Sequence, residues 1–186
     1  MASYDYGKSE VIDYIVKLAL EKRQSMFTVL DVGACDGKWA DMIRAAFERE
    51  FLSDAHEGED IPLLRIDGVE KFKPNAARCI NKYNSFYIGG IEDYWYPADY
   101  YDVIIFGDVI EHMEVLQAQL CLERAKNSAS EVIVGVPYLY RQGAIYGNPY
   151  EVHVQHDLTH ELFMERYPGF KSLIRPMPNY EYFVKE

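Results

Sequence analysis

The sequence predicts an α/β protein with a doubly wound, mostly parallel sheet and helices on both faces. Two observations support this prediction. Apolar runs rich in Val and Ile alternate with amphipathic stretches along most of the chain, and an early run leads directly into a turn with two glycines. Regular alternation of strands and helices is typical of a parallel sheet that is covered on both faces. With 186 residues and a hydrophobic content of 49%, the chain is long enough for one domain with a sizeable core.

The individual elements follow from the hydrophobic periodicity. Apolar residues at helical spacing between Val11 and Leu20 predict an N-terminal helix, and Pro74 suits the first turn of a later one. Short runs of β-branched residues predict strands. In chain order, helices are expected over residues 9–24, 38–51, 73–83, 114–129 and 159–167, and strands over 27–33, 62–70, 85–90, 100–108, 130–137, 170–176 and 179–186.

The regular alternation stops after Pro137. A long irregular stretch follows, then one helix and two late strands that are expected to close the sheet as a hairpin. An irregular connection of this length inside a compact domain is uncommon and is typical of a lid or a binding loop. The prediction is one domain in four parts: an N-terminal helix (1–25), a cofactor-binding core (27–137), a substrate loop or lid (138–160), and a C-terminal helix with a strand hairpin (161–186).

Composition and charge limit the classes of partner. The net charge of −11 predicts a surface that repels the phosphate backbone, so duplex nucleic acid is not expected as a substrate. No apolar run is long enough to span a bilayer, and the first ten residues lack the features of an export signal. The three cysteines are scattered, as in a cytoplasmic protein without a disulfide framework. The acidic segment 53–62 is expected to be a solvated loop, and the oligomeric state is not indicated.

The stretch VLDVGACDGKWADMI, residues 29–43, joins a predicted strand to a helix through Gly33 and Gly37. Ligands of doubly wound sheets bind at such turns, where glycine allows positive φ and close approach of the backbone. A pyrophosphate-binding turn would have glycine in place of Cys35, and the carboxylate of Asp31 would repel a pyrophosphate. Glu70, at the end of the next strand, suits a ribose diol. The two acidic strand ends therefore favour a positively charged nucleoside.

Five motifs in this order resemble those of the class I S-adenosylmethionine-dependent methyltransferases. They are VLDVGACDGKWA, IDGVEKF, YIGGIEDYW, YDVIIFGDVIEHM and VIVGVP, and the resemblance covers nearly the whole chain. It implies a Rossmann-like, seven-stranded sheet with a C-terminal antiparallel strand. It also implies an enzyme that uses S-adenosyl-L-methionine as its cofactor and releases S-adenosyl-L-homocysteine.

The resemblance also implies roles for individual residues. Asp31, Gly33 and Ala34 would hold the methionine part of the cofactor, and Glu70 would hold the ribose hydroxyls. The family often has an acid where Gly90 stands, so adenine contacts are expected from neighbouring residues. The implied adenine contacts are Phe72, Ile91 and Glu92. The mouth below the methyl group would be lined by Asp108, Glu111 and His112. The remaining cofactor contacts would be Cys35, Gly37, Trp39, Gly90, Asp108 and Val109.

The segment 138–160 is expected to bind the methyl acceptor. Its tyrosines and Arg141 suit stacking on, and hydrogen bonding to, a sugar or another hydroxylated ring, although the tyrosines would also serve to seal the end of the sheet. GNPYEVHVQHDLTHELF is similar to a segment of small bacterial methyltransferases associated with surface glycans, with Asp157-Leu158-Thr159 in place of their tryptophan and its neighbours. We expect O-methylation of a hydroxylated small molecule or sugar. The predicted acceptor contacts are Glu111, Tyr138, Tyr140, Arg141, Tyr146, Tyr150, His153 and His156.

The predicted catalytic residues are His153, His112 and Asp108, with one of the two imidazoles as the general base because imidazole titrates near neutrality. A metal site at His153, His156, Asp157 and His160 is an alternative, but Asp157 is expected to cap the helix that follows it, and no metal is predicted. Two further alternatives remain. They are a methyltransferase for a small carboxylate or phenolic metabolite, and a catalytically inactive cofactor-binding accessory domain.

Overall fold

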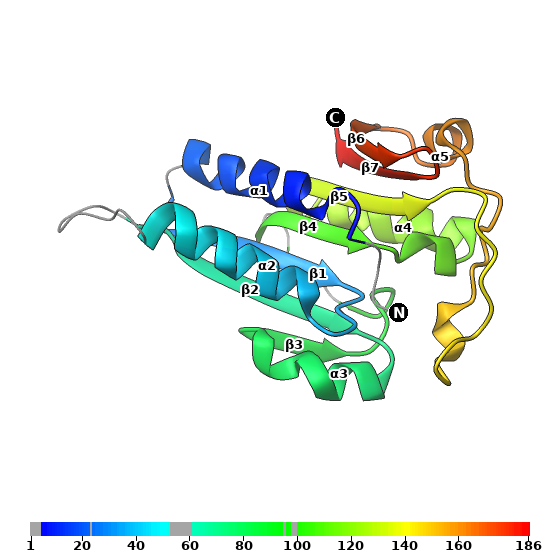
Figure 1. The fold of residues 1–186 in the computed structure, drawn as a ribbon, viewed down its shortest axis with the longest axis horizontal. Helices are drawn as coiled ribbons and strands as arrows, with labels where there is room; N and C mark the ends of the chain where they lie inside the picture. Colours follow the sequence, from blue (N-terminus) through cyan, green and yellow to red (C-terminus); the bar gives the residue numbers. More distant parts are fainter. Residues whose placement is uncertain (1–4, 23, 53–60, 95, 98–99) are drawn as a thin grey trace.

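The described residues form one seven-stranded sheet with the strand order β3-β2-β1-β4-β5-β7-β6 (Figure 1). The computed structural model describes residues 5–22, 24–52, 61–94, 96–97 and 100–186. The strands are β1 (Met26–Val32), β2 (Leu63–Glu70), β3 (Ser85–Ile88), β4 (Tyr101–Gly107), β5 (Ala129–Pro137), β6 (Phe170–Met177) and β7 (Tyr180–Lys185). Strands β1 to β5 pair in parallel, and β7 is antiparallel to both β5 and β6. The predicted fold class is confirmed.

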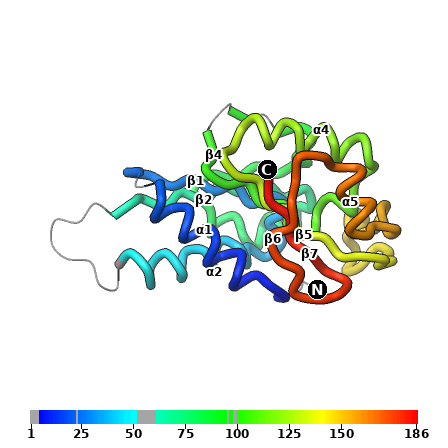
Figure 2. Tube along the Cα trace, turned by 90° about the horizontal axis from the view of Figure 1, so that it is seen from above, coloured from blue at the N-terminus to red at the C-terminus, as the bar shows by residue number. Residues whose placement is uncertain are grey.

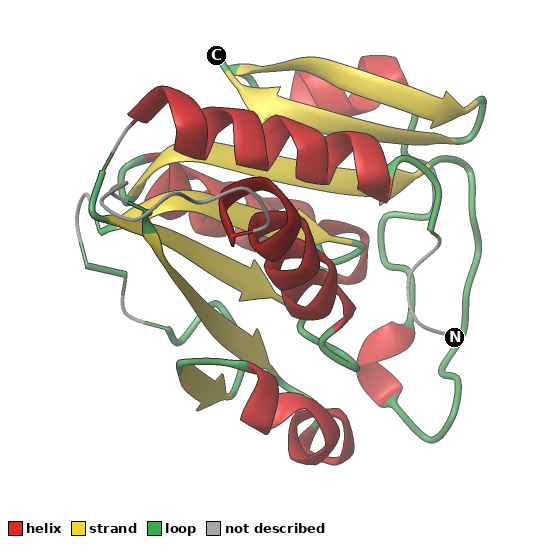
Figure 3. Cartoon of the chain, turned by 60° about the vertical axis from the view of Figure 1, so that its left-hand side comes forward, coloured by secondary structure: helices red, strands yellow, loops and turns green. Residues whose placement is uncertain are grey.

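Helices cover both faces of the sheet. They are α1 (Lys8–Lys22), α2 (Lys38–Phe47), α3 (Lys73–Cys79), α4 (Val115–Lys126) and α5 (His160–Arg166). Figure 2 shows α1 and α2 on one side of the sheet and α4 on the other, and Figure 3 gives the same layers in a third view. Side chains alternate along the central strands, as their pleat requires. In β4, Val103 and Ile105 pack with α1 and α2, whereas Ile104 and Phe106 pack with α4.

The helix starts differ in their capping. Gly37 precedes α2 with φ 77°, a conformation that favours glycine. Thr159 caps α5, because its hydroxyl accepts a hydrogen bond from the Leu162 amide at 3.2 Å. The prediction that Asp157 caps this helix is therefore wrong. The Asp157 carboxylate instead forms an ion pair with Arg166 at 2.6 Å.

The boundaries of other elements also differ from those expected. The predicted helix 38–51 is α-helical only to Phe47 and continues as a π-helical turn, η1 (Glu48–Leu52). The short turns η2 (Ile80–Lys82), η3 (Ile110–His112) and η4 (Pro149–Glu151) were not expected. Most of the acidic segment 53–62 lies outside the described residues. Among the described helices, none is both long and apolar enough to cross a membrane.

Candidate active site

A cavity of about 840 Å³ lies at the carboxyl ends of the parallel strands. Its walls come from the turn after β1, the ends of β2 and β5, the turn at residues 89–92, the turn after β4, and the segment 140–154. Ligands of open α/β sheets bind at this edge, where the strand order reverses. Here the reversal falls between β1 and β4, which are neighbours in the sheet. The cavity therefore lies where the topology predicts a ligand site.

The turn after β1 approaches both the cavity and the neighbouring turn closely. Gly33 has φ 74°, and a Cβ atom there would lie 2.7 Å from Cγ2 of Val109. The amides of Gly33 and Ala34 both donate to the carbonyl of Val69, at 2.9 and 3.0 Å. Cys35 also has positive φ, at 50°. These bonds hold the turn in a conformation that exposes its backbone to the cavity.

The carboxylate of Glu70 joins the turn after β1 to the start of α3. Its Oε2 accepts a hydrogen bond from the Cys35 amide at 2.8 Å, and its Oε1 accepts one from the Phe72 amide at 2.6 Å. Burial raises the pKa of this carboxyl, and the two backbone amides oppose the shift. Each oxygen has a second lone pair. Glu70, which lines the cavity, therefore has the capacity to accept further hydrogen bonds from a ligand.

Asp31 lies behind the cavity wall rather than on it. Its side chain is fully buried, and Oδ2 accepts a hydrogen bond from the Tyr83 hydroxyl at 2.5 Å. Oδ1 has no hydrogen-bond partner among the described residues. Burial raises the pKa of Asp31 to about 6, and the Tyr83 hydrogen bond and the Lys8 ammonium oppose this shift. A negative charge close behind the glycine turn would be stabilised by a cation in the cavity.

Arg124, in α4, fixes the turn at residues 89–92, and no sequence pattern had singled it out. Its guanidinium donates to the carbonyls of Ile91 (3.1 Å), Glu92 (2.9 Å) and Tyr94 (2.6 Å). The Glu92 carboxylate is ion-paired with Lys71. Arg124 thus holds this turn through hydrogen bonds to backbone carbonyls. Ile91 and Glu92 of the turn line the cavity.

A buried lysine, Lys8, lies near the part of the cavity wall that Trp39 forms. The Nζ atom of Lys8, in the first turn of α1, lies 5.0 Å from the centre of the Trp39 ring. Burial lowers the pKa of Lys8, and the nearby carboxylate of Asp108 opposes the shift. Trp39 lines the cavity and packs so closely on β4 that a Cβ atom on Gly107 would lie 2.5 Å from its Nε1. The sequence did not distinguish Lys8 from an exposed lysine at a helix start.

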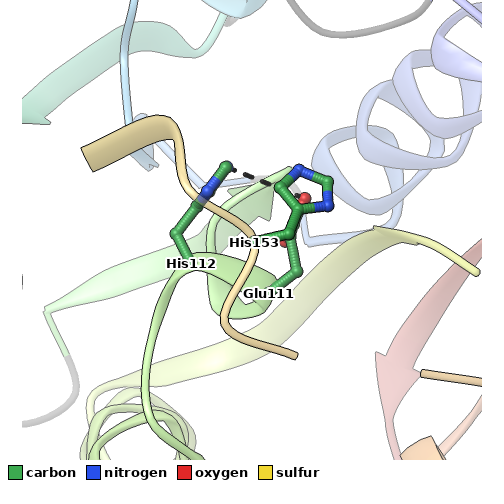
Figure 4. A group of neighbouring side chains, drawn as sticks. All are labelled: Glu111, His112 and His153. Atoms are coloured by element: carbon green, nitrogen blue, oxygen red, sulfur yellow. Dashed lines mark ion pairs between the residues drawn. The ribbon is translucent and has the colours of Figure 1, made fainter. Parts of the chain in front are cut away.

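Two histidines and a glutamate meet at the far end of the cavity (Figure 4). Glu111 and His112 belong to η3, and His153 belongs to the segment that follows η4. The imidazole centres of His112 and His153 lie 4.7 Å apart in an edge-on arrangement. Nδ1 of His112 lies 3.2 Å from the carbonyl oxygen of Val152, and Nδ1 of His153 lies 2.8 Å from that of Tyr140.

Burial dominates the protonation of this group. Burial, and to a smaller extent the neighbouring His112, lower the pKa of His153 to about 4. Burial likewise lowers the pKa of His112. The pKa of the fully buried Glu111 carboxyl lies well above its usual range, because of burial and the nearby Asp108. Both imidazoles are therefore neutral at pH 7 in the structure as it stands.

The segment 140–154 forms the outer wall and presents tyrosines to solvent. Tyr146 is 80% exposed and Tyr150 is 48% exposed, so neither seals the core. The ring of Tyr150 lies 5.0 Å from Nζ of Lys71, across the cavity mouth. Asn148 shapes the segment, because its Oδ1 accepts a hydrogen bond from the Tyr150 amide at 3.0 Å and its Nδ2 donates to Glu151.

Solved structures with the same architecture are known, although the sequence matches no protein-family model and no curated protein sequence. A TehB-like SAM-dependent methyltransferase from Corynebacterium glutamicum superposes with a TM-score of 0.60 and 11% identity over 100% of this chain and 90% of that one. Magnesium protoporphyrin IX methyltransferase from Synechocystis, with bound SAM, superposes with a TM-score of 0.58 and 12% identity over 96% of this chain and 79% of that one. The small RNA methyltransferase HEN1 superposes with a TM-score of 0.60 and 18% identity, over 99% of this chain but only 26% of the HEN1 chain.

This chain has the class I methyltransferase fold. On this methyltransferase fold, the predicted site residues fall into two groups. Most of them line the large cavity described above: Gly33, Ala34, Cys35, Trp39, Glu70, Gly90, Ile91, Glu92, Asp108, Val109, Glu111, His112, Tyr140, Arg141, Tyr146, Tyr150 and His153. The others, which do not line it, are Asp31, Gly37, Phe72, Tyr138 and His156.

Tyr138, one of the residues outside the cavity, has a structural role instead. The hydroxyl of Tyr138 donates to the Glu181 carboxylate at 2.6 Å, and this buried pair closes the end of β5 against β7. His160 also contacts Glu181, at 3.2 Å. His156, a member of the alternative metal set, lies outside α5, which begins at His160. The residue that approaches His153 is His112, about forty positions earlier in the chain.

Proposed function

We propose that this protein transfers the methyl group of S-adenosylmethionine to a hydroxylated small molecule or sugar. The observation that carries the proposal is the arrangement of one cavity. At one end, the glycine turn after β1 faces Glu70 and the turn at Ile91. At the other end, neutral imidazoles stand beneath a tyrosine-rich segment. Residues 27–137 would bind the cofactor, and residues 138–160 would bind the acceptor.

The residues at the glycine turn fit a cofactor that carries positive charge. The position of Gly33 against Val109 leaves no room for a side chain there, so a ligand can approach the backbone. Asp31 provides a buried oxygen without a hydrogen-bond partner among the described residues. Acidic residues also outnumber basic ones around the cavity, with Asp36, Glu70, Glu92, Asp108, Glu111 and Glu151 against Lys38, Lys71 and Arg141.

Individual residues would hold the parts of the cofactor as follows. Gly33 and Ala34 would hold its methionine part, with the negative charge of Asp31 behind them. Glu70 would accept hydrogen bonds from the ribose hydroxyls with its remaining lone pairs. Ile91 and Glu92 would border the adenine, on a turn that Arg124 fixes.

The acceptor site would be formed by the exposed side chains of segment 140–154. Tyr140, Tyr146 and Tyr150 offer rings that stack on a sugar face and hydroxyls that bond to its oxygens. Arg141 adds a fork of donors. Tyr146 is 80% exposed, so its ring is accessible to an acceptor at the cavity mouth. These features favour a small hydroxylated acceptor over a large apolar one.

S-Adenosylmethionine, when bound, supplies a methyl group that leaves its bonding electrons on sulfur and joins the acceptor oxygen, which loses its proton. The chain's own residues must therefore orient the acceptor and make its proton easier to remove. The Nε2 atoms of His112 and His153 are suited to this step, with Asp108 beside them. Two chemical roles fit such a pair: a general base, or ligands of a cation that binds the hydroxyl group.

Calorimetric titration tests the proposal directly. The protein should bind S-adenosylmethionine and S-adenosylhomocysteine with a dissociation constant in the micromolar range or below, and NAD should bind far more weakly. Replacement of Glu70 by Ala should weaken S-adenosylhomocysteine binding by roughly 1–3 kcal/mol, because charged hydrogen bonds are lost. Glu165 is an exposed residue of α5, outside the cavity, so Glu165→Ala is the matched control. Tight NAD binding without binding of either sulfur compound would refute the proposal.

A further inference from the structure

We infer that Glu111, His112 and His153 bind a divalent metal ion at the acceptor end of the cavity. One ligand atom from each of these three side chains lies within 4.8 Å of the other two. The sequence had suggested a different set of ligands, at His153, His156, Asp157 and His160, and had favoured no metal. The site does not require the cofactor, but its chemical use rests on the proposed function.

The carboxylate of Glu111 is the first observation that points to a cation. The side chain is fully buried, and neither Oε1 nor Oε2 has a hydrogen-bond partner among the described residues. A buried carboxylate without a partner costs several kcal/mol of stability and is usually paired or bound to a metal. The Nε2 atom of His112 lies 4.0 Å from Oε1 of this carboxyl group. This distance is too long for a hydrogen bond, so both carboxyl oxygens of Glu111 are left for a ligand.

The hydrogen bonds of the two imidazoles are the second observation. A backbone carbonyl only accepts hydrogen bonds, so Nδ1 of His112 donates to Val152 and Nδ1 of His153 donates to Tyr140. Each neutral ring therefore has its lone pair on Nε2. Metal-binding histidines commonly donate their second ring N–H to a backbone carbonyl, which fixes the tautomer and the ring orientation. Both rings are oriented in this way before any ion binds.

The spacing requires a small movement of one of the two segments that carry the ligands. A tetrahedral ion with bonds of about 2.0–2.1 Å holds its ligand atoms about 3.4 Å apart, so the three side chains must approach by roughly 1 Å. Glu111 and His112 lie in one turn after β4, whereas His153 lies in the segment after η4. The backbone N–H of Gln155 already donates to the backbone carbonyl of Glu111 at 2.9 Å, and this bond holds the two segments together. An ion would strengthen this attachment.

The ligand set indicates the class of metal. Two imidazoles and one carboxylate suit Zn²⁺, Mn²⁺, Co²⁺ or Fe²⁺, whereas Mg²⁺ and Ca²⁺ prefer all-oxygen sites. Three protein ligands leave coordination positions open, as in catalytic rather than structural sites. Because the group lines the cavity, these positions face the space for the acceptor. A hydroxyl group bound there would lose its proton more easily, and adjacent hydroxyls of a sugar would be oriented.

Metal binding can be measured without turnover. Co²⁺ added to the purified, metal-free protein should give visible absorption bands that saturate at one ion per chain, and Mn²⁺ should raise the melting temperature. His153→Ala and Glu111→Gln should each weaken binding by about tenfold or more. His156→Ala is the matched control, because His156 lies in the same segment but outside the cavity, and it should bind Co²⁺ as the wild type does. Far-ultraviolet circular dichroism establishes that each variant is folded.

Two outcomes would overturn the inference: failure of the folded wild type to bind Co²⁺ or Mn²⁺, and equal binding by the wild type and His153→Ala. Calorimetry with S-adenosylhomocysteine separates this failure from failure of the proposed function. His153→Ala should retain the cofactor affinity of the wild type, because the cofactor would contact the opposite end of the cavity. Loss of metal binding with intact cofactor binding supports the metal site. Intact cofactor binding without any metal binding in the wild type leaves His153 or His112 as the general base.

Discussion

Replacement of Asp31 by Asn should change how the stability of the protein depends on pH. Burial raises the pKa of Asp31 to about 6 in the folded state, from an ordinary value of 3.8. Between these two values the folded state binds more protons than the unfolded state, so the free energy of unfolding falls as pH rises. A difference of this size corresponds to about 3 kcal/mol, lost between roughly pH 4 and pH 6. The Asp31→Asn variant should lack this decline.

The absolute stability of the variant depends on a second, opposing effect. The Asn carbonyl would still accept the hydrogen bond from Tyr83, but its amide nitrogen would replace Oδ1, which has no partner among the described residues. An unsatisfied buried donor costs about 1–3 kcal/mol at every pH. The predicted quantity is therefore the difference in slope between the two proteins, not the offset between them.

Urea denaturation at a series of pH values between about 3.5 and 7.5, followed by circular dichroism, measures this slope. Asp13→Asn is the matched control, because the Asp13 side chain is 71% exposed, and its profile should parallel that of the wild type. If Asp31→Asn and the wild type lose stability in parallel from about pH 4 to pH 6, Asp31 does not carry a raised pKa, and the description of its burial is wrong.

Three other substitutions test separate parts of the site. Gly33→Ala should weaken S-adenosylhomocysteine binding in calorimetry, because a positive φ costs alanine about 1–2 kcal/mol and the new Cβ would lie 2.7 Å from Val109. Gly143→Ala is the control and should bind normally, because a Cβ atom there would have no atom within 4 Å. Arg124→Lys should lower the same affinity about tenfold, because one ammonium cannot hold three carbonyls as the guanidinium does; unchanged affinity would mean that the turn needs no such support. Thr159→Ala should lower the urea-derived stability by about 1 kcal/mol through loss of the α5 cap, and no loss would contradict the capping assignment.

The order of strands and helices could be predicted because it depends on local composition. Buried runs such as β4 and β5 are almost entirely apolar, and glycine or polar residues mark their ends. The ends of elements were less predictable. Asp157 and Thr159 are both common capping residues, and only the contact of Asp157 with Arg166 decides between them. Such a choice depends on tertiary contacts that local sequence does not contain.

The segment around His153 illustrates why the site was harder to predict than the fold. Here the pattern is inverted, because Val152 and Val154 are each 40% exposed whereas His153 and Gln155 are buried. The Gln155 side chain donates to the carbonyls of Ile110 and Met113, at 2.8 and 3.0 Å, and so attaches this segment to η3. Hydrogen bonds of Gln155 to a distant turn, and of His153 to the Tyr140 carbonyl, thus offset the burial of these polar residues. No pattern of hydrophobicity reveals such partners.

Residues near the glycine turn show the same division. Gly33 and Glu70 were predicted from their positions at strand ends, and both line the cavity. Lys8 and Arg124 were missed, because each acts from a helix that is distant in sequence. Their burial or bonding follows from how α1 and α4 pack on the sheet. Position at a strand end is therefore predictable, whereas support from a neighbouring helix is not.

A crystal structure of the protein grown with S-adenosylhomocysteine tests the central claim most directly. We predict that the ligand occupies the cavity at the ends of β1, β2 and β4. Its ribose hydroxyls should lie within hydrogen-bond distance of Glu70, its adenine against Ile91, and its sulfur on the side of the cavity that faces Asp108 and His112. A ligand bound elsewhere on the molecule, or an unoccupied cavity at saturating ligand concentration, would contradict the claim that this cavity is a methyltransferase cofactor site.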